Sequence, residues 1–290
     1  MRALVCVAVL LQAGSAAAWC QLTTSQADPE GRACVEDGTP LRWMRPCISY
    51  SIDMSGSAYQ DLETVRTLVG LSFDQWTNTL CSGTQIDLQV EETELAVCHR
   101  AEYSAGGSNS NTIAFRSDWP GRYDDLAYAI TTVWHSKRTG EILDADILVN
   151  EEQFPWADCA MGGCDDAPDG LPYVDVRNVM THEAGHFFGL AHSQLLAATM
   201  DPQSARGDTF KRILRTDDVL GICTIYPPGT MDGECDFAPR GGLDLDCTDD
   251  GCSAGGRSTG WTGAFLLLLF SRRFWRAVWL GAVSPSSKSD

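Results

Sequence analysis

Residues 181–193 have the sequence THEAGHFFGLAHS, and this stretch carries most of the information about fold and chemistry. His182 and His186 are four residues apart, so on a helix they lie on one face and can direct ring nitrogens at a single ion. Glu183 stands beside them, where its carboxylate can reach a metal-bound water. The spacing therefore predicts a helix that carries a metal site.

The residues after this helix supply a third ligand. Gly189 allows a sharp backbone turn that a residue with a Cβ would resist, and the chain then returns to present His192. Three neutral imidazoles leave the fourth tetrahedral position open, which is typical of a catalytic and not of a structural zinc. We therefore expect one catalytic Zn²⁺ held by His182, His186 and His192, with Glu183 as the catalytic residue.

The extended motif resembles the metzincin signature, and Ser193 after the third histidine is similar to the matrixin branch, which contains the matrix metalloproteinases. Metzincins carry a methionine turn beneath the zinc, and Met200, eight residues after His192, stands where that turn is expected. A tyrosine usually follows near this methionine, whereas this chain has Asp201 and Gln203. The resemblance implies a secreted zinc endopeptidase in which Glu183 activates a zinc-bound water to hydrolyse peptide bonds.

The resemblance covers residues 41–228 and implies an α+β fold: a twisted mixed β-sheet, an active-site helix and a closing C-terminal helix. Hydrophobic periodicity agrees with this plan. It predicts strands at residues 47–52, 86–90 and 111–115 and a helix at 61–79, while the resemblance implies strands at 126–134 and 139–147, the metal-site helix at 174–190 and the closing helix at 214–222. Thr216 is the expected N-cap of the last helix.

Composition narrows the range of functions. With 290 residues, of which 44% are hydrophobic, the chain is long enough for one substantial core and one small appendage. A net charge of -18 argues against nucleic-acid binding by the folded domain, because phosphate recognition needs a basic surface. The acidity serves either solubility or calcium binding, and Asp144, Asp146 and Asn150 are the candidate Ca²⁺ ligands.

The chain has two histidines outside the motif, and neither is expected to bind a second metal ion. His99 and His135 are expected on the surface or in loops. Matrix metalloproteinases hold a structural zinc with histidines of the two strands above the cleft, and this chain has Tyr128 and Asp146 at comparable places. The resemblance therefore implies a single zinc ion.

The N-terminus predicts an exported protein. Residues 1–18 form an expected signal peptide, with Arg2 before an apolar run and small residues at 16–18, so that the mature chain begins at Trp19. The chain contains 12 cysteines, which in an exported protein indicate disulfides. Connectivity cannot be deduced from sequence, but short loops favour the pairs Cys81 with Cys98, Cys159 with Cys164 and Cys235 with Cys247.

Residues 19–40 form a cysteine-containing N-terminal segment before the catalytic domain. Matrix metalloproteinases are kept latent by a propeptide thiol in a Pro-Arg-Cys-Gly motif, and that motif does not occur here. Cys34 is a weak candidate for such a thiol, and an ordinary disulfide is the favoured alternative.

Beyond the domain, residues 229–250 predict an acidic, cysteine-containing spacer that is either tied by disulfides or flexible. In residues 251–290, Cys252 precedes an apolar run at 261–270 and then Arg272 and Arg273, an order that resembles the MYXO-CTERM sorting tail. The resemblance implies a tail that is processed or anchored at the cell envelope. Because the apolar run is far shorter than the roughly 20 residues that span a bilayer, a degenerate tail is the alternative.

Three functions agree with the sequence. The favoured one is an active, monomeric endopeptidase with peptide or protein substrates, secreted or attached to the cell surface through its tail. The alternatives are an inactive zinc-binding surface protein and a zinc hydrolase that acts on an ester or a glycan amide. All four positions of the motif are intact, which favours an active peptidase.

Overall fold

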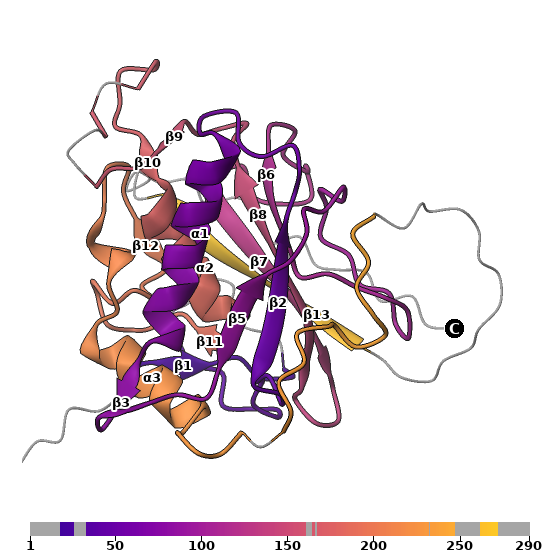
Figure 1. Cartoon of the computed structure of the whole chain (residues 1–290). Coiled ribbons are helices and arrows are strands. Elements are labelled where there is room, and N and C mark those ends of the chain that lie inside the picture. Colours follow the sequence, from indigo (N-terminus) through magenta and orange to yellow (C-terminus); the bar gives the residue numbers. More distant parts are fainter. Residues whose placement is uncertain are drawn as a thin grey trace, which may run out of the picture.

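The chain folds as an α+β domain in which two helices cover one face of a mixed β-sheet (Figure 1). The computed structural model describes residues 18–25, 33–160, 164, 165, 167–231, 233–246 and the backbone of 262–271. Within these residues the main sheet has seven strands. Across the sheet they are β12 (Gln203–Ser204), β13 (Thr262–Ser271), β7 (Ala127–Ser136), β8 (Ile142–Asn150), β6 (Thr112–Arg116), β2 (Cys47–Ile52) and β5 (Gln89–Glu92).

The direction of the strands changes at β7. The strands β5, β2, β6 and β8 run parallel to one another, whereas β7 is antiparallel to β8 and to β13. The short elements outside this sheet are β1 (Cys20–Gln21), β3 (Leu80–Cys81), β4 (Thr84–Gln85), β9 (Trp156–Ala157), β10 (Val174–Asp175), β11 (Leu190–Ala191) and the 3-10 helix η1 (Phe210–Arg212). The change of direction places an antiparallel strand beside the helix that carries the histidines.

Helix α1 (Leu62–Thr77) forms where the apolar periodicity predicted it. Asp61 caps the N-terminus, because its carboxylate accepts the N–H of Thr64 at 2.9 Å. The buried face includes Phe73 and Trp76, and the Trp76 indole N–H donates to the carbonyl of Thr181 at 2.8 Å. This bond joins α1 to the helix that holds the metal motif.

Helix α2 (Val176–Phe187) is shorter than the predicted 174–190. It begins after Asp175, whose carboxylate accepts the N–H of Asn178, and ends before Gly189, whose φ is +92°. A Cβ at Gly189 would lie 2.6 Å from the carbonyl oxygen of Leu41, so only glycine fits this turn. The turn ends the helix and directs the chain into β11.

The closing helix α3 (Thr216–Ile225) is present, but its cap differs from the prediction. The N-cap residue is Arg215, and Thr216 is the first helical residue. The Asp218 carboxylate accepts the N–H of Arg215 at 2.8 Å, so an acid in the first turn satisfies the helix start in place of a threonine hydroxyl.

One strand and one histidine also differ from the predictions. The strand expected at 86–90 lies at β5 instead, because pairing with β2 begins at Gln89, opposite Cys47. Ile86 and Leu88 are buried before the strand starts, which explains the misleading alternation. His135 was expected on the surface or in a loop, but it is fully buried in β7.

The disulfides connect parts of the chain that are far apart in sequence. Cys47 pairs with Cys235, and Cys81 pairs with Cys223, so the predicted pairs Cys81 with Cys98 and Cys235 with Cys247 are wrong. The remaining described pairs are Cys20 with Cys34 and Cys159 with Cys164, the second as predicted. Cys98 is also disulfide-bonded.

The segments before residue 41 and after residue 228 are attached to the part of the chain between them. Leu22 is buried and donates its N–H to the carbonyl of Gly189 at 2.9 Å, while β1 pairs with β11. After the domain, the N–H of Val97 donates to the carbonyl of Leu245 at 2.7 Å. The expected signal peptide lies outside the described residues except for Ala18, as does most of the expected tail.

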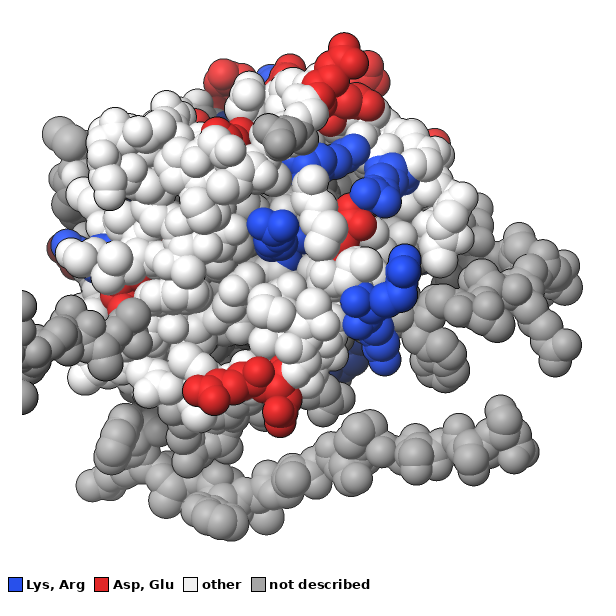
Figure 2. All heavy atoms as spheres, turned by 90° about the horizontal axis from the view of Figure 1, so that it is seen from below, with Lys and Arg blue, Asp and Glu red and all other residues white. Residues whose placement is uncertain are grey.

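The charge of the molecule is unevenly distributed. On the face seen from below, Lys and Arg side chains gather on one side and acidic groups lie mainly toward the margins, with a wide uncharged area between them (Figure 2). The overall acidity therefore does not make this face uniformly negative. Of the helices that the structure describes, none has the length and apolar content needed to cross a bilayer.

Candidate metal centre and catalytic site

The three histidines of the motif converge at one buried point. His182 and His186 come from α2, and His192 follows β11, after the turn at Gly189. All three are buried, and their ligand atoms lie within 4.8 Å of one another. Mutually close imidazole nitrogens of this kind match the ligand set of a tetrahedral zinc site.

The hydrogen bonds of the rings orient the nitrogens. Nδ1 of His182 lies 2.7 Å from the carbonyl oxygen of Thr199, and Nδ1 of His186 lies 2.8 Å from that of Leu190. A carbonyl only accepts, so each of these Nδ1 atoms carries the proton and each Nε2 keeps a free lone pair. The Nε2 atoms of all three histidines are buried and have no hydrogen-bond partner among the described residues.

Burial also keeps the rings neutral. It lowers the pKa of His186 to about 3 and lowers the pKa of His182 and His192 well below the ordinary value. A metal ion binds neutral imidazoles through free nitrogen lone pairs. The three rings are neutral and their Nε2 lone pairs have no protein partner among the described residues, so these residues fit zinc.

Glu183 lies in the same site but makes different contacts. One carboxylate oxygen, Oε2, accepts a hydrogen bond from the Thr131 hydroxyl at 2.6 Å, and Oε1 has no partner among the described residues. Burial raises the pKa of Glu183 to about 8. A cation beside this carboxylate would oppose that shift, because an opposite charge favours the ionised form. The arrangement leaves one oxygen free to exchange a proton.

Met200 packs against helix α2. It is fully buried, and a Cβ built on Gly185 would overlap its sulfur, so the thioether lies directly against α2 at Gly185. The buried Asp218 fixes this turn from α3, because its carboxylate accepts the N–H groups of Thr199 and Met200 at 2.8 and 3.0 Å. Thr199 in turn orients His182.

A buried lysine completes the surroundings of the site. Lys211 is fully buried and donates from Nζ to the carbonyl of Asp201, next to Met200. Burial lowers the pKa of Lys211 to about 7, and the nearby Asp201 and Glu183 oppose this effect. The lysine therefore ties η1 to the methionine turn.

Sequence reasoning missed Thr131, Asp218 and Lys211. Thr131 stands in a strand of ordinary alternation, and Asp218 resembles any acid in the first turn of a helix. Lys211 has the residue type that is least expected in a core. No local pattern distinguishes them, since each acts through contacts between segments that are distant in sequence.

The candidate calcium ligands do not come together in this way. Asp146 accepts the N–H groups of Thr112 and Glu102 at 2.6 and 2.9 Å, and the Asn150 amide donates to the carbonyls of Asp125 and Ala127. Among the described residues, the acid and histidine groups close enough to share a metal include neither Asp144 nor Asp146. Calcium binding therefore has no support here.

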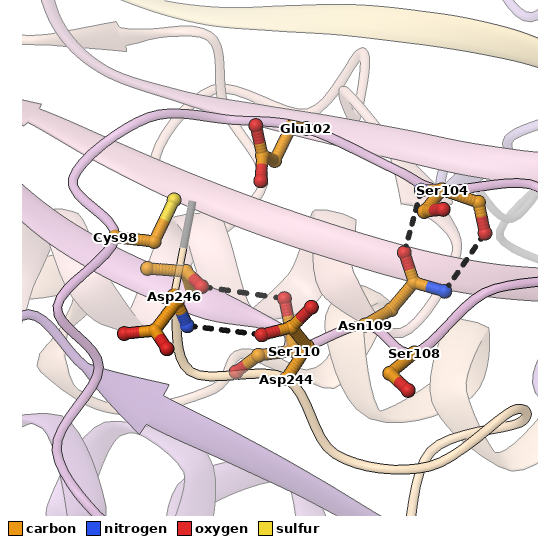
Figure 3. Close-up of a pocket in the computed structure, with 9 residues that line it drawn as sticks. Cys98, Glu102, Ser104, Ser108, Asn109, Ser110, Asp244 and Asp246 are labelled. Carbon is orange, nitrogen blue, oxygen red and sulfur yellow. Dashed lines mark hydrogen bonds between the residues drawn. The ribbon is translucent and has the colours of Figure 1, made fainter. Parts of the chain in front are cut away.

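An acidic pocket lies elsewhere on the molecule and shares no residue with the histidine site. Its lining includes the carboxyl side chains of Glu102, Asp244 and Asp246 with several hydroxyl groups (Figure 3). Asn109 donates to the carbonyl of Ser104, which helps to hold one wall. The pocket contains no histidine and does not resemble the centre formed by α2.

Comparison with known proteins agrees with this geometry. Residues 42–227 match the family model described as Matrixin. Over 194 residues the chain is 29% identical to "Metalloendoproteinase 1-MMP" of Arabidopsis thaliana, which covers 66% of this chain and 46% of the plant protein. The chain thus spans about half the length of that relative. Because the family model covers most of the chain, including every residue of the histidine site, the chain belongs to the matrixin family.

Proposed function

We propose that this protein is a zinc-dependent endopeptidase, with His182, His186 and His192 as metal ligands and Glu183 as the catalytic residue. The observation that carries the proposal is the convergence of three buried Nε2 atoms without partners beside the free Oε1 of Glu183. The plant relative is named a metalloendoproteinase, which supports the same class of reaction.

The chemistry follows from the residues present. When bound, a zinc ion lowers the pKa of water and polarises a carbonyl group. Glu183 then takes the proton from the attacking water at Oε1 and returns it to the nitrogen of the leaving amine. Thr131 holds the other carboxylate oxygen and so fixes the orientation of Glu183. Asp218 supports the methionine turn, whose Thr199 carbonyl orients the His182 ring, and Met200 packs against α2 at Gly185.

The substrate would bind as an extended chain along β7. This strand runs antiparallel to β8, and its Thr131 contacts Glu183, so the opposite edge of β7 adjoins the catalytic residues. An extended peptide adds to such an edge through main-chain hydrogen bonds, which gives affinity without strict sequence preference. Peptides and proteins are therefore the proposed substrates.

Export is part of the proposal. The expected signal peptide at residues 1–18 and the disulfides of the catalytic region support a location outside the cytoplasm. Attachment to the cell surface through the tail rests on sequence resemblance alone.

The test is digestion of a mixed peptide library, with and without a zinc chelator. It uses the full chain, its Glu183→Ala variant and a chain in which residues 262–271 are replaced by a Gly/Ser segment of equal length. We expect cleavage that the chelator abolishes and that Glu183→Ala lowers by about 10²- to 10⁴-fold. Glu183→Ala should retain one zinc ion per chain. Absence of cleavage by every zinc-loaded chain, or equal cleavage by Glu183→Ala, would overturn the proposal.

A further inference from the structure

The edge of β7 that faces away from β8 is occupied by the chain's own C-terminal segment. β13 runs antiparallel along β7, from Thr262 opposite Ser136 to Phe270 opposite Ala127 (Figure 1). On its other side β13 pairs in parallel with β12, the short strand that follows the methionine turn. The segment therefore lies between β12 and β7, the strand whose Thr131 contacts Glu183.

The register places the middle of β13 next to the catalytic site. Leu267 lies opposite Thr131, and the Thr131 hydroxyl holds the Glu183 carboxylate. β13 also approaches α2, the helix that carries His182 and His186. An extended substrate on β7 would need this same edge, and two chains cannot form hydrogen bonds with one edge at the same time.

We infer that residues 262–271 are an intramolecular ligand of the active-site cleft and keep the enzyme latent until they leave β7. The inference rests on the proposed function, because it assumes that substrates pair with the same edge. It differs from a thiol switch: Cys34, the weak candidate for that role, is joined to Cys20.

The sequence of the segment suits this role. Residues 262–271 read TGAFLLLLFS, with no charged residue and no proline, so each residue has a backbone N–H for pairing. Branched and aromatic side chains favour the extended conformation, and the absence of charge removes the usual protection of an edge strand against pairing.

The attachment of the segment raises its local concentration. The Leu245 carbonyl accepts the N–H groups of Val97 and Cys98, in the loop after β5, and residues 247–261 join this point to β13. A short tether gives an effective concentration in the millimolar range, so a tethered segment of modest affinity competes well with a dilute free peptide. Latency follows from this competition, without a covalent bond to the site.

The first experiment measures occupancy without catalysis. In a Glu183→Ala background, amide hydrogen exchange compares the parent chain with Leu266→Pro/Leu267→Pro. Two adjacent prolines interrupt the ladder whichever of the two N–H groups faces β7. We expect the amides of β7 that face β13 to exchange at least about tenfold faster, with the amides of β8 unchanged. The matched control, Ser286→Pro/Ser287→Pro, places two prolines in the same tail outside β13 and should behave as the parent.

The second experiment measures latency with Glu183 intact and with the mass of each chain verified. We expect Leu266→Pro/Leu267→Pro to cleave library peptides with a kcat/KM about tenfold or more above that of the full chain, because the fraction of open clefts rises. A lysine-flanked peptide of residues 262–271 should inhibit this variant more than the full chain. If the proline variant fails to fold, the chain with the Gly/Ser segment of equal length replaces it.

The outcomes separate the two proposals. Unchanged exchange in β7, with peptides cleaved equally by both chains, would overturn latency and leave the endopeptidase intact. Faster exchange in β7, with no peptide cleaved by any zinc-loaded chain, would overturn the endopeptidase and keep the occupancy of the edge by β13. Faster exchange together with higher kcat/KM is the expected result.

Discussion

The Asp218 carboxylate accepts the backbone N–H of Met200 at 3.0 Å, so the closing helix directly supports the turn beneath the histidines. Asp218 is fully buried, and burial raises its pKa, which its backbone hydrogen bonds oppose. The Asp218 carboxylate accepts three N–H groups. No other side chain of the same length has two acceptor oxygens, so a substitution at this position cannot preserve all three hydrogen bonds.

Replacement of Asp218 should therefore weaken both the fold and the metal site. We expect Asp218→Asn to lower the free energy of unfolding by about 1–3 kcal/mol, because one acceptor becomes a donor that faces a backbone N–H. Zinc affinity should fall about 10- to 100-fold, since Thr199 orients His182. Urea unfolding and chelator competition measure the two effects. Asp74→Asn, on the exposed side of α1, is the control and should change neither.

Thr131 offers a test of how Glu183 is positioned. Thr131→Val keeps the shape but removes the hydroxyl that donates to Oε2, so we expect kcat/KM to fall about 10- to 100-fold, with zinc content unchanged. The control is Thr132→Val at the next position, where the buried hydroxyl has no hydrogen-bond partner among the described residues. Equal activity of the two variants would remove Thr131 from the mechanism.

The contact between Gly185 and Met200 predicts an unusual response to alanine. Gly185→Ala should destabilise the protein by about 1–3 kcal/mol despite the better helix propensity of alanine, because the new Cβ meets the Met200 sulfur and Trp76. Gly70→Ala, in α1, is the control. Its Cβ would find only the Tyr50 hydroxyl at 3.9 Å, so it should stabilise by about 0.5–1 kcal/mol. Thermal and urea unfolding measure both; a stabilising Gly185→Ala would contradict the packing.

Met200 itself should tolerate a change of shape better than a loss of volume. Met200→Leu should cost less than about 1.5 kcal/mol, whereas Met200→Ala should cost about 2–5 kcal/mol, because it leaves a cavity under α2. The free energy of unfolding from urea titration measures the difference. A Met200→Ala variant as stable as the parent would contradict the packing of this turn.

The buried pair Asp144 and Asp146 predicts how stability depends on pH. Burial, followed by the charges of Asp146 and Glu102, raises the pKa of Asp144 well above its ordinary value. Above pH 4 the folded state therefore binds more protons than the unfolded state, and this stabilisation is lost as the pH rises through the folded pKa. We expect Asp144→Asn to flatten that decline and to be more stable than the parent at neutral pH. Urea unfolding between pH 4 and 8 measures it, with Asp74→Asn as control.

The sequence predicted the features that depend on local pattern. The three histidines converge because helix periodicity and one glycine turn fix their directions, and α1 and β2 lie where the apolar pattern predicted them. The errors arise where the burial of a residue does not coincide with the predicted limits of a paired strand. Ile86 and Leu88 are buried without belonging to a strand, and His135 is buried because β7 continues beyond residue 134, where the predicted strand ended.

Contacts between distant segments could not be predicted. Cys47 and Cys235 are 188 residues apart, and nothing in their spacing distinguishes this pair from the shorter ones that loop length favours. The position of residues 262–271 could not be predicted either. An apolar run of this length agrees with a tail as well as with a strand, and it forms a strand because it pairs with the edge of β7.

The two long disulfides also determine what happens when the chain is cut. Leu195 and Leu196 are 48% and 75% exposed, in the segment between His192 and Met200, which offers other copies of a peptidase a place to cleave. A cut there falls between Cys81 and Cys223 and between Cys47 and Cys235, so both pieces stay covalently joined. Preparations that have nicked themselves would therefore migrate as whole molecules until they are reduced, and loss of activity in such samples would precede any visible loss of mass.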